Sequence, residues 1–156
     1  MGNKICFLFG NSTTPYEALP WIEQAAERHY LELGIRTFVI GNRGNFDSYA
    51  ATAIKSLKRK HRDISLVLLL AYHPGERPFE LPAGFDSSYY PPLENVPRKY
   101  AIVRTNKYMI DTADSIICYA KFAGNCKELL EYAKRHCKIN NTFVEDISDF
   151  KMQETS

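Results

Sequence analysis

Short apolar runs alternate along the chain with longer stretches in which apolar residues recur every three or four positions. The runs lie at residues 4–9, 36–40, 65–72, 115–119 and 141–145. The stretches with the period of an amphipathic helix lie at residues 20–33, 50–57, 97–113 and 126–137. Nearly continuous apolar strands that alternate with helices are typical of a parallel sheet covered on both faces. We therefore expect an α/β, Rossmann-like three-layer sandwich with a parallel sheet of about five strands.

Residues that favour helix ends mark the boundaries of the expected helices. Gly34 follows the first helical stretch and suits a C-terminal cap in the left-handed conformation. Asp47 or Ser48 is expected to cap the start of the second helix, and Asn95 the start of the third.

The segment from residue 73 to residue 97 interrupts this alternation. It holds six of the eight prolines and four aromatic residues, Phe79, Phe85, Tyr89 and Tyr90. A loop of this length inside a compact domain is usually functional or mobile. Its aromatic side chains could stack on a bound base, anchor the loop on the core or form a subunit contact, and the sequence leaves these alternatives open.

Two polar, glycine-containing loops follow the first two expected strands. They are GNSTT at residues 10–14 and GNRGNFD at residues 41–47. Ligands of such folds bind beyond the carboxyl ends of the strands, and free N–H groups at a helix start favour an anion. Both loops could equally be tight strand-to-helix turns, because neither matches a dinucleotide or P-loop fingerprint. Asp47 has two compatible interpretations, as a helix cap or as a group that binds a ribose hydroxyl or acts as a base.

The composition changes this picture little. Of 156 residues, 45% are hydrophobic and 24% charged, which is ordinary for a soluble globular protein. We expect one domain over residues 1–147 and a flexible tail at residues 148–156. The longest apolar run is too short to span a bilayer, and the first residues do not resemble a signal peptide. We therefore expect a cytoplasmic protein without a membrane partner.

Cysteine, histidine and net charge argue against several classes of ligand. The four cysteines form no C-x-x-C pair and the four histidines are scattered, so we expect neither a metal nor a cofactor. Cys6 and Cys118 lie inside apolar runs and are expected to be buried, reduced thiols. A net charge of +2 argues against a nucleic-acid partner, and the basic cluster at residues 55–62 is interpreted as a solvated helix end.

Two long segments of the chain resemble the SLOG superfamily. They are TFVIGNRGNFDSYAATAIKSLKR with the following ISLVLLLAYHPGE, and YPPLENVPRKYAIVRTNKYMIDTADSIICY. The first carries the G-x-x-G-x-F-D signature of the small YpsA-like group, and the resemblance covers roughly residues 5–144. It implies a Rossmann-like nucleotide-binding fold. Its relatives include the Lonely Guy phosphoribohydrolases, sensors of nucleotide-derived signals and a branch that loads recombinase on DNA, and members often form homo-oligomers.

The chain departs from the catalytic members of that superfamily at three places. Asn11 and Ser12 stand where the group usually has histidine and arginine. The phosphoribohydrolase arginine four positions before the methionine of the third helix falls on Thr105, with Arg104 beside it. The P-G-G-x-G-T-x-x-E motif matches residues 120–128 only at its last glycine and its glutamate. The missing glycines and threonine would form part of the phosphate-binding loop in those enzymes. The missing arginine is a candidate for stabilising charge at the reacting sugar.

We therefore expect binding of a nucleotide or a nucleotide-derived small molecule without catalysis. The expected binding residues are Gly10, Asn11, Ser12, Thr13, Gly41, Asn42, Gly44, Asn45, Asp47, Arg104, Asn106, Gly124 and Asn125. One alternative is an N-glycoside hydrolase acting on nucleoside monophosphates, with Asp47 and Glu128 as candidate catalytic residues. Another is an interaction protein with a vestigial pocket that Phe46 or Arg43 fills.

Overall fold

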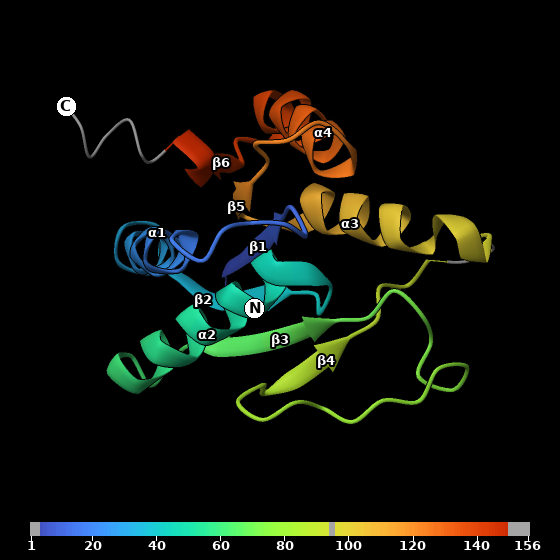
Figure 1. Ribbon diagram of the computed structural model, residues 1–156, viewed down its shortest axis with the longest axis horizontal. Helices are drawn as coiled ribbons and strands as arrows, with labels where there is room; N and C mark the ends of the chain where they lie inside the picture. Colours follow the sequence, from blue (N-terminus) through green and yellow to red (C-terminus); the bar gives the residue numbers. More distant parts are fainter. Residues whose placement is uncertain (1–3, 94–95, 150–156) are drawn as a thin grey trace.

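A computed structural model describes residues 4–93 and 96–149, and its centre is a parallel sheet (Figure 1). The strands are β1 (Lys4–Gly10), β2 (Ile35–Ile40), β3 (Ser65–Leu69), β4 (Ser87–Tyr89), β5 (Ser115–Tyr119) and β6 (Phe143–Asp146). Their order across the sheet is β4-β3-β2-β1-β5-β6, and every pair is parallel. The expected α/β, Rossmann-like class is confirmed.

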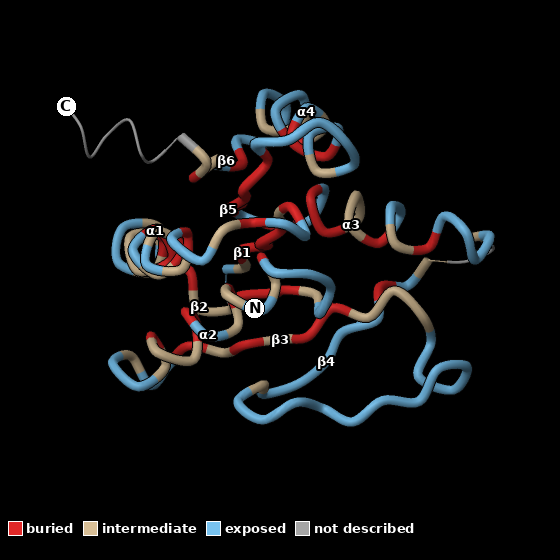
Figure 2. Tube along the Cα trace, viewed as in Figure 1, coloured by how far each residue is buried: buried red, intermediate tan, exposed pale blue. Residues whose placement is uncertain are grey.

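Helices cover both faces of the sheet. They are α1 (Ala18–Leu33), α2 (Gly44–Lys60), α3 (Ala101–Thr112) and α4 (Asn125–Asn140), with short 3-10 turns η1 (Arg98–Tyr100) and η2 (Ile147–Asp149). Cys6 and Leu8 of β1 belong to the core under α1 and α2, whereas Phe7 and Phe9 belong to the core under α3 and α4. Alternate residues of one strand therefore serve two cores, which is why the apolar run is continuous. Figure 2 shows the buried segments along the central strands.

Several sequence-based details are confirmed. Gly34 caps α1 with a left-handed φ of 75°. Cys6 and Cys118 are buried free thiols, and burial is the main cause that raises the pKa of Cys6 to about 12. No helix within residues 4–93 and 96–149 combines the length and the apolar character needed to cross a bilayer.

The predicted helix and strand starts are wrong at several positions. Helix α2 begins at Gly44, so Asp47 lies in its first turn and neither Asp47 nor Ser48 is the cap. Helix α3 begins later than expected because Pro97 is extended, with ψ of 143°, and the turn η1 intervenes. The last strand is shifted toward Asp146. Asn95 and most of the expected tail, residues 150–156, lie outside the described residues, while residues 148–149 belong to η2.

The sixth strand, β4, lies inside the segment expected to be a loop. Its three residues are exposed and carry no apolar pattern, but they pair with β3 at the sheet edge. Asp86 explains this pairing, because its carboxylate accepts hydrogen bonds from the Leu66 N–H at 2.7 Å and from Lys58 Nζ at 2.6 Å. One carboxylate thus ties the returning loop to β3 and to α2.

A buried polar network ties α1 to β5 and β6. The imidazole of His29, which is 1% exposed, contacts Ser115 Oγ at 2.8 Å and Glu145 Oε1 at 3.0 Å. Arg28 donates to the same carboxylate at 2.6 and 3.1 Å. Burial alone would raise the pKa of Glu145, but the hydrogen bonds from His29 and Arg28 outweigh it and lower the pKa to about 2.

This network predicts a specific loss of stability in acid. The pKa of Glu145 falls from 4.5 in the unfolded chain to about 2 in the folded one. Its contribution is therefore present above pH 4.5 and is lost as the pH falls toward 2. We expect Glu145→Gln to lower the free energy of unfolding at pH 7 by roughly 2–4 kcal/mol, and to flatten its decrease between pH 5 and pH 3.

Urea unfolding at a series of pH values measures this effect. Asp63→Asn is the matched control, because it removes a carboxylate that is 55% exposed and pairs with Arg36, which is 34% exposed, while an amide oxygen can still accept from the Tyr30 hydroxyl. We expect this control to leave the free energy of unfolding nearly unchanged. Equal losses in the two variants would contradict the assigned role of Glu145.

Candidate functional site

The strand order determines where a ligand can bind. The chain builds β2, β3 and β4 on one side of β1, then crosses back to place β5 and β6 on the other side. The chain therefore leaves the carboxyl ends of the adjacent strands β1 and β5 in opposite directions, toward β2 from β1 and toward β6 from β5. In open parallel sheets, a point where the order reverses in this way opens a crevice for ligands.

A cavity of about 410 Å³ lies at this position. Its walls come from the ends of β1 and β3, the start of α2, one side of α3 and the start of α4. Eight of the expected binding residues line it: Gly10, Asn11, Ser12, Thr13, Gly41, Asp47, Asn106 and Asn125. Segments far apart in the sequence thus meet at one site.

The remaining expected residues do not line this cavity. They are Asn42, Gly44, Asn45, Arg104, Gly124 and Glu128. Arg104 is exposed on α3, whereas its neighbour Thr105 is buried, because one residue turns a helix by about 100°. Glu128 lies instead in an adjoining groove of about 300 Å³ between α3 and α4. The two candidate catalytic carboxylates, Asp47 and Glu128, therefore line different hollows.

Close contact between two loops shapes one wall of the cavity. The N–H of Asn45 donates to the carbonyl of Ser12 at 2.9 Å, and Asn45 Nδ2 donates to the carbonyl of Thr14 at 3.3 Å. Gly44 has φ of 84°, and a Cβ there would lie 2.6 Å from Ser12 Cα. A Cβ on Gly10 would lie 2.4 Å from the buried ring of Phe46. Both glycines are therefore needed for this loop contact, and Phe46 lies outside the cavity lining.

Asn11 shapes the other wall of the cavity. Its backbone carbonyl accepts hydrogen bonds from the N–H and the hydroxyl of Thr14, at 3.1 and 2.6 Å. Its side-chain Oδ1 accepts from the N–H groups of Lys121 and Phe122, at 3.0 and 3.4 Å. Asn11 therefore joins the loop after β1 to the loop after β5.

Asp47 is a half-buried carboxylate in the cavity wall. Burial raises its pKa to about 6, although the Arg43 N–H, which donates to Oδ2 at 2.9 Å, and the Arg43 charge oppose this shift. Asp47 is not the helix cap that the sequence suggested, but its carboxylate accepts the Arg43 N–H at the start of α2 and also lines the cavity. Near neutral pH, that carboxyl can accept a hydrogen bond or exchange a proton.

The cavity also contains residues that the sequence reasoning did not select as binding residues. Arg43 and Cys126 come from the helix starts, Leu69 from β3, Ile102 from α3 and Phe122 from the loop after β5. Burial raises the pKa of the Cys126 thiol to about 11, so it is neutral rather than a reactive thiolate. In the sequence, the position of Arg43 inside the glycine loop could have identified it as a cavity residue. The apolar cavity residues could not be identified in this way, because their sequence pattern is that of ordinary core residues.

A scan against protein-family models finds no match for this chain, and a search of curated proteins finds none either. Within the described part of the chain, no group of three histidine, cysteine or acidic residues is arranged to hold a metal ion.

The loop contact predicts unequal effects of alanine at two glycines. Gly34 and Gly44 have φ of 75° and 84°, but a Cβ on Gly34 meets nothing within 4 Å, whereas a Cβ on Gly44 meets Ser12. We expect Gly34→Ala to cost about 1 kcal/mol of unfolding free energy through backbone strain alone. Gly44→Ala is expected to cost about 2–4 kcal/mol, because it adds the clash. Chemical denaturation measures both, and equal losses would show that the loops are not in close contact.

The environment of Asp47 predicts a pH dependence opposite to that of Glu145. The folded pKa of about 6 exceeds the unfolded value of 3.8, so this group contributes stability below pH 3.8 that is lost as the pH rises through 6. We expect the carboxyl carbon of Asp47 to titrate near pH 6 by NMR. We also expect Asp47→Asn to increase stability at pH 8 by on the order of 1 kcal/mol. A titration midpoint near 4 would contradict the assigned desolvation.

Proposed function

We propose that the protein binds a nucleotide or a nucleotide-derived small molecule in the cavity at the carboxyl ends of β1, β2 and β3, without cleaving it. The observation that carries this proposal is the position of the cavity, at the point where the strand order reverses, with a polar loop from β1 in its wall. Its volume of about 410 Å³ is within the usual range for small-molecule sites. The resemblance of the sequence to the SLOG superfamily adds independent support.

The apolar part of the cavity suits a flat heterocycle. Phe9, Leu69, Ile102 and Leu129 supply apolar surface. Asn106 projects into the same cavity from α3, and no hydrogen bond engages its side chain within the described residues. A carboxamide both donates and accepts, so it can pair with the edge of a base.

The polar part of the cavity suits a ribose and a phosphate. The loop residues Gly10–Thr13 line the cavity, and so does Asn125, at which α4 begins. The unpaired N–H groups and dipole of a helix start favour an anion at that point. Asp47 lines the same cavity and can accept a hydrogen bond from a ribose hydroxyl.

Calorimetry against nucleosides, nucleoside phosphates, cyclic nucleotides and ADP-ribose tests the proposal. We expect at least one compound to bind with a Kd below 1 mM, and Asn106→Ala to weaken that binding about 5- to 10-fold through loss of one or two hydrogen bonds. Gln24→Ala, which removes an exposed carboxamide from α1, is the matched control and is expected to bind normally. The absence of binding by every compound would contradict the proposal.

One observation favours the hydrolase alternative. A carboxyl with a pKa of about 6 inside a cavity is typical of acid–base catalysts. Chromatography of nucleoside monophosphates after incubation with the protein separates the two functions. Release of free base that disappears in Asp47→Asn would favour the hydrolase, whereas binding without release supports the proposed function.

A further inference from the structure

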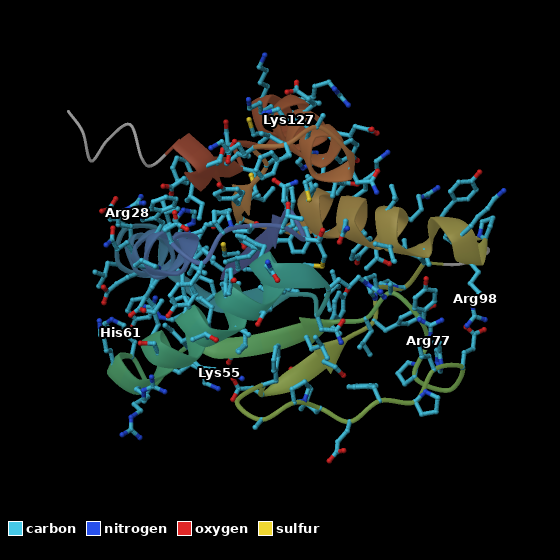
Figure 3. The ribbon with its side chains drawn as sticks, in the orientation of Figure 1. Arg28, Lys55, His61, Arg77, Arg98 and Lys127 are labelled. Atoms are coloured by element: carbon cyan, nitrogen blue, oxygen red, sulfur yellow. The ribbon has the colours of Figure 1, made fainter. Side chains whose placement is uncertain are left out.

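Three arginines surround one tyrosine ring next to the cavity. Tyr72 follows β3, and the guanidinium carbons of Arg77, Arg98 and Arg43 lie 4.1, 5.5 and 5.7 Å from its ring centroid. These arginines come from the loop after β3, from η1 and from the residue before α2. Figure 3 shows Arg77 and Arg98 at the same end of the molecule. Three distant segments thus place positive charge at one point.

The charges near this arginine cluster, Arg43, Arg77 and Arg98, determine whether it can bind an anion. Within residues 4–93 and 96–149, none of the three forms an ion pair. Two carboxylates lie nearby: the Arg43 charge lowers the pKa of Asp47 against the larger effect of burial, and Glu76 lines the small cavity that includes Tyr72. A tyrosine ring attracts each cation weakly, but it does not remove the repulsion between them. An added anion would relieve that repulsion.

The cluster is continuous with the main cavity. Arg43 lines the main cavity, and Ala71 lines both that cavity and a smaller one of about 160 Å³ that includes Tyr72. The strand β3 lies two positions from β1 in the sheet, a distance of roughly 10 Å. A ligand whose nucleoside occupies the main cavity can therefore reach the cluster with an extended phosphate chain.

The basic groove at the other end of α2 is a weaker candidate for an anion. Lys55, Lys58, Arg59 and Arg62 line it, but Lys58 is already paired with Asp86 at 2.6 Å. In the described part of the chain, none of the clustered arginines forms an ion pair. Guanidinium groups also match the geometry of phosphate oxygens better than ammonium groups do.

We propose that Arg43, Arg77 and Arg98 around Tyr72 form a subsite for the terminal phosphates of a nucleoside di- or triphosphate. This inference rests on the proposed function, because it places the nucleoside part of the same ligand in the main cavity. It narrows the ligand class from nucleotides in general to those with an oligophosphate chain.

Calorimetry with a nucleoside and its mono-, di- and triphosphate, together with tripolyphosphate alone, tests the inference. We expect the affinity to increase at least 10-fold from the monophosphate to the triphosphate. Arg77→Gln and Arg98→Gln are each expected to weaken triphosphate binding about 5- to 20-fold and to leave nucleoside binding unchanged. Arg59→Gln, which neutralises an exposed arginine in the basic groove, is the matched control and is expected to bind all ligands normally.

The possible results separate this inference from the proposed function. Equal affinities for the monophosphate and the triphosphate, or normal triphosphate binding by both glutamine variants, would overturn the subsite and leave the proposed function standing. Binding of tripolyphosphate that both variants weaken, with no nucleoside bound and no nucleoside phosphate bound more tightly than tripolyphosphate, would support the anion site and contradict the proposed function. No binding by any of these compounds would overturn both. A circular-dichroism melting curve for each variant confirms that it is folded.

Discussion

The contact between the loop after β1 and the start of α2 determines the shape of the site. The carbonyl of Ser12 accepts the N–H of Asn45, and this approach is available only because Gly44 has no side chain. The Asn45 N–H is therefore not free to donate to a bound anion. The Arg43 N–H is not free either, because it donates to Asp47. The start of α2 is thus largely satisfied within the protein, which shifts the expected anion positions toward α4 and the arginine cluster. A glycine loop that resembles a phosphate cradle in sequence serves here mainly to hold a cavity wall.

Most of the fold was predictable because its signals are local. Four of the five expected strands and all four helices follow from hydrophobic period, and Gly34 caps α1 as predicted. The fifth strand was placed two residues early. The strand β4 was not predictable, since its exposed residues have no hydrophobic pattern. Its pairing with β3 depends on the hydrogen bond between Asp86 and the Leu66 N–H, two residues that are 20 positions apart in the sequence. The start of α2 was placed too late because a capping residue was expected ahead of the helix, whereas Asp47 acts from inside its first turn.

The candidate site was predictable in its position and only partly in its members. Parallel strands bring their carboxyl ends together, so the loops at residues 10–13 and 41–47 had to be neighbours. The roles of individual residues depend on side-chain direction, which a single sequence does not give. Asn11, expected to contact a ligand, ties two loops together, and Arg104 lies on the exposed side of α3. The arginine cluster joins residues 43, 77 and 98, and only the folded chain brings them to one ring.

Binding of a nucleotide or a nucleotide-derived molecule in this cavity is the proposal on which the oligophosphate subsite also rests. Titration of isotope-labelled protein with the best-binding compound, followed by amide NMR shifts, tests it most directly. We expect the largest changes at Gly10–Thr13, Asn106 and Asn125, which line the cavity, and small changes at the basic groove around Arg59. Shifts concentrated at that groove, or no saturable shifts with any nucleotide, would contradict it.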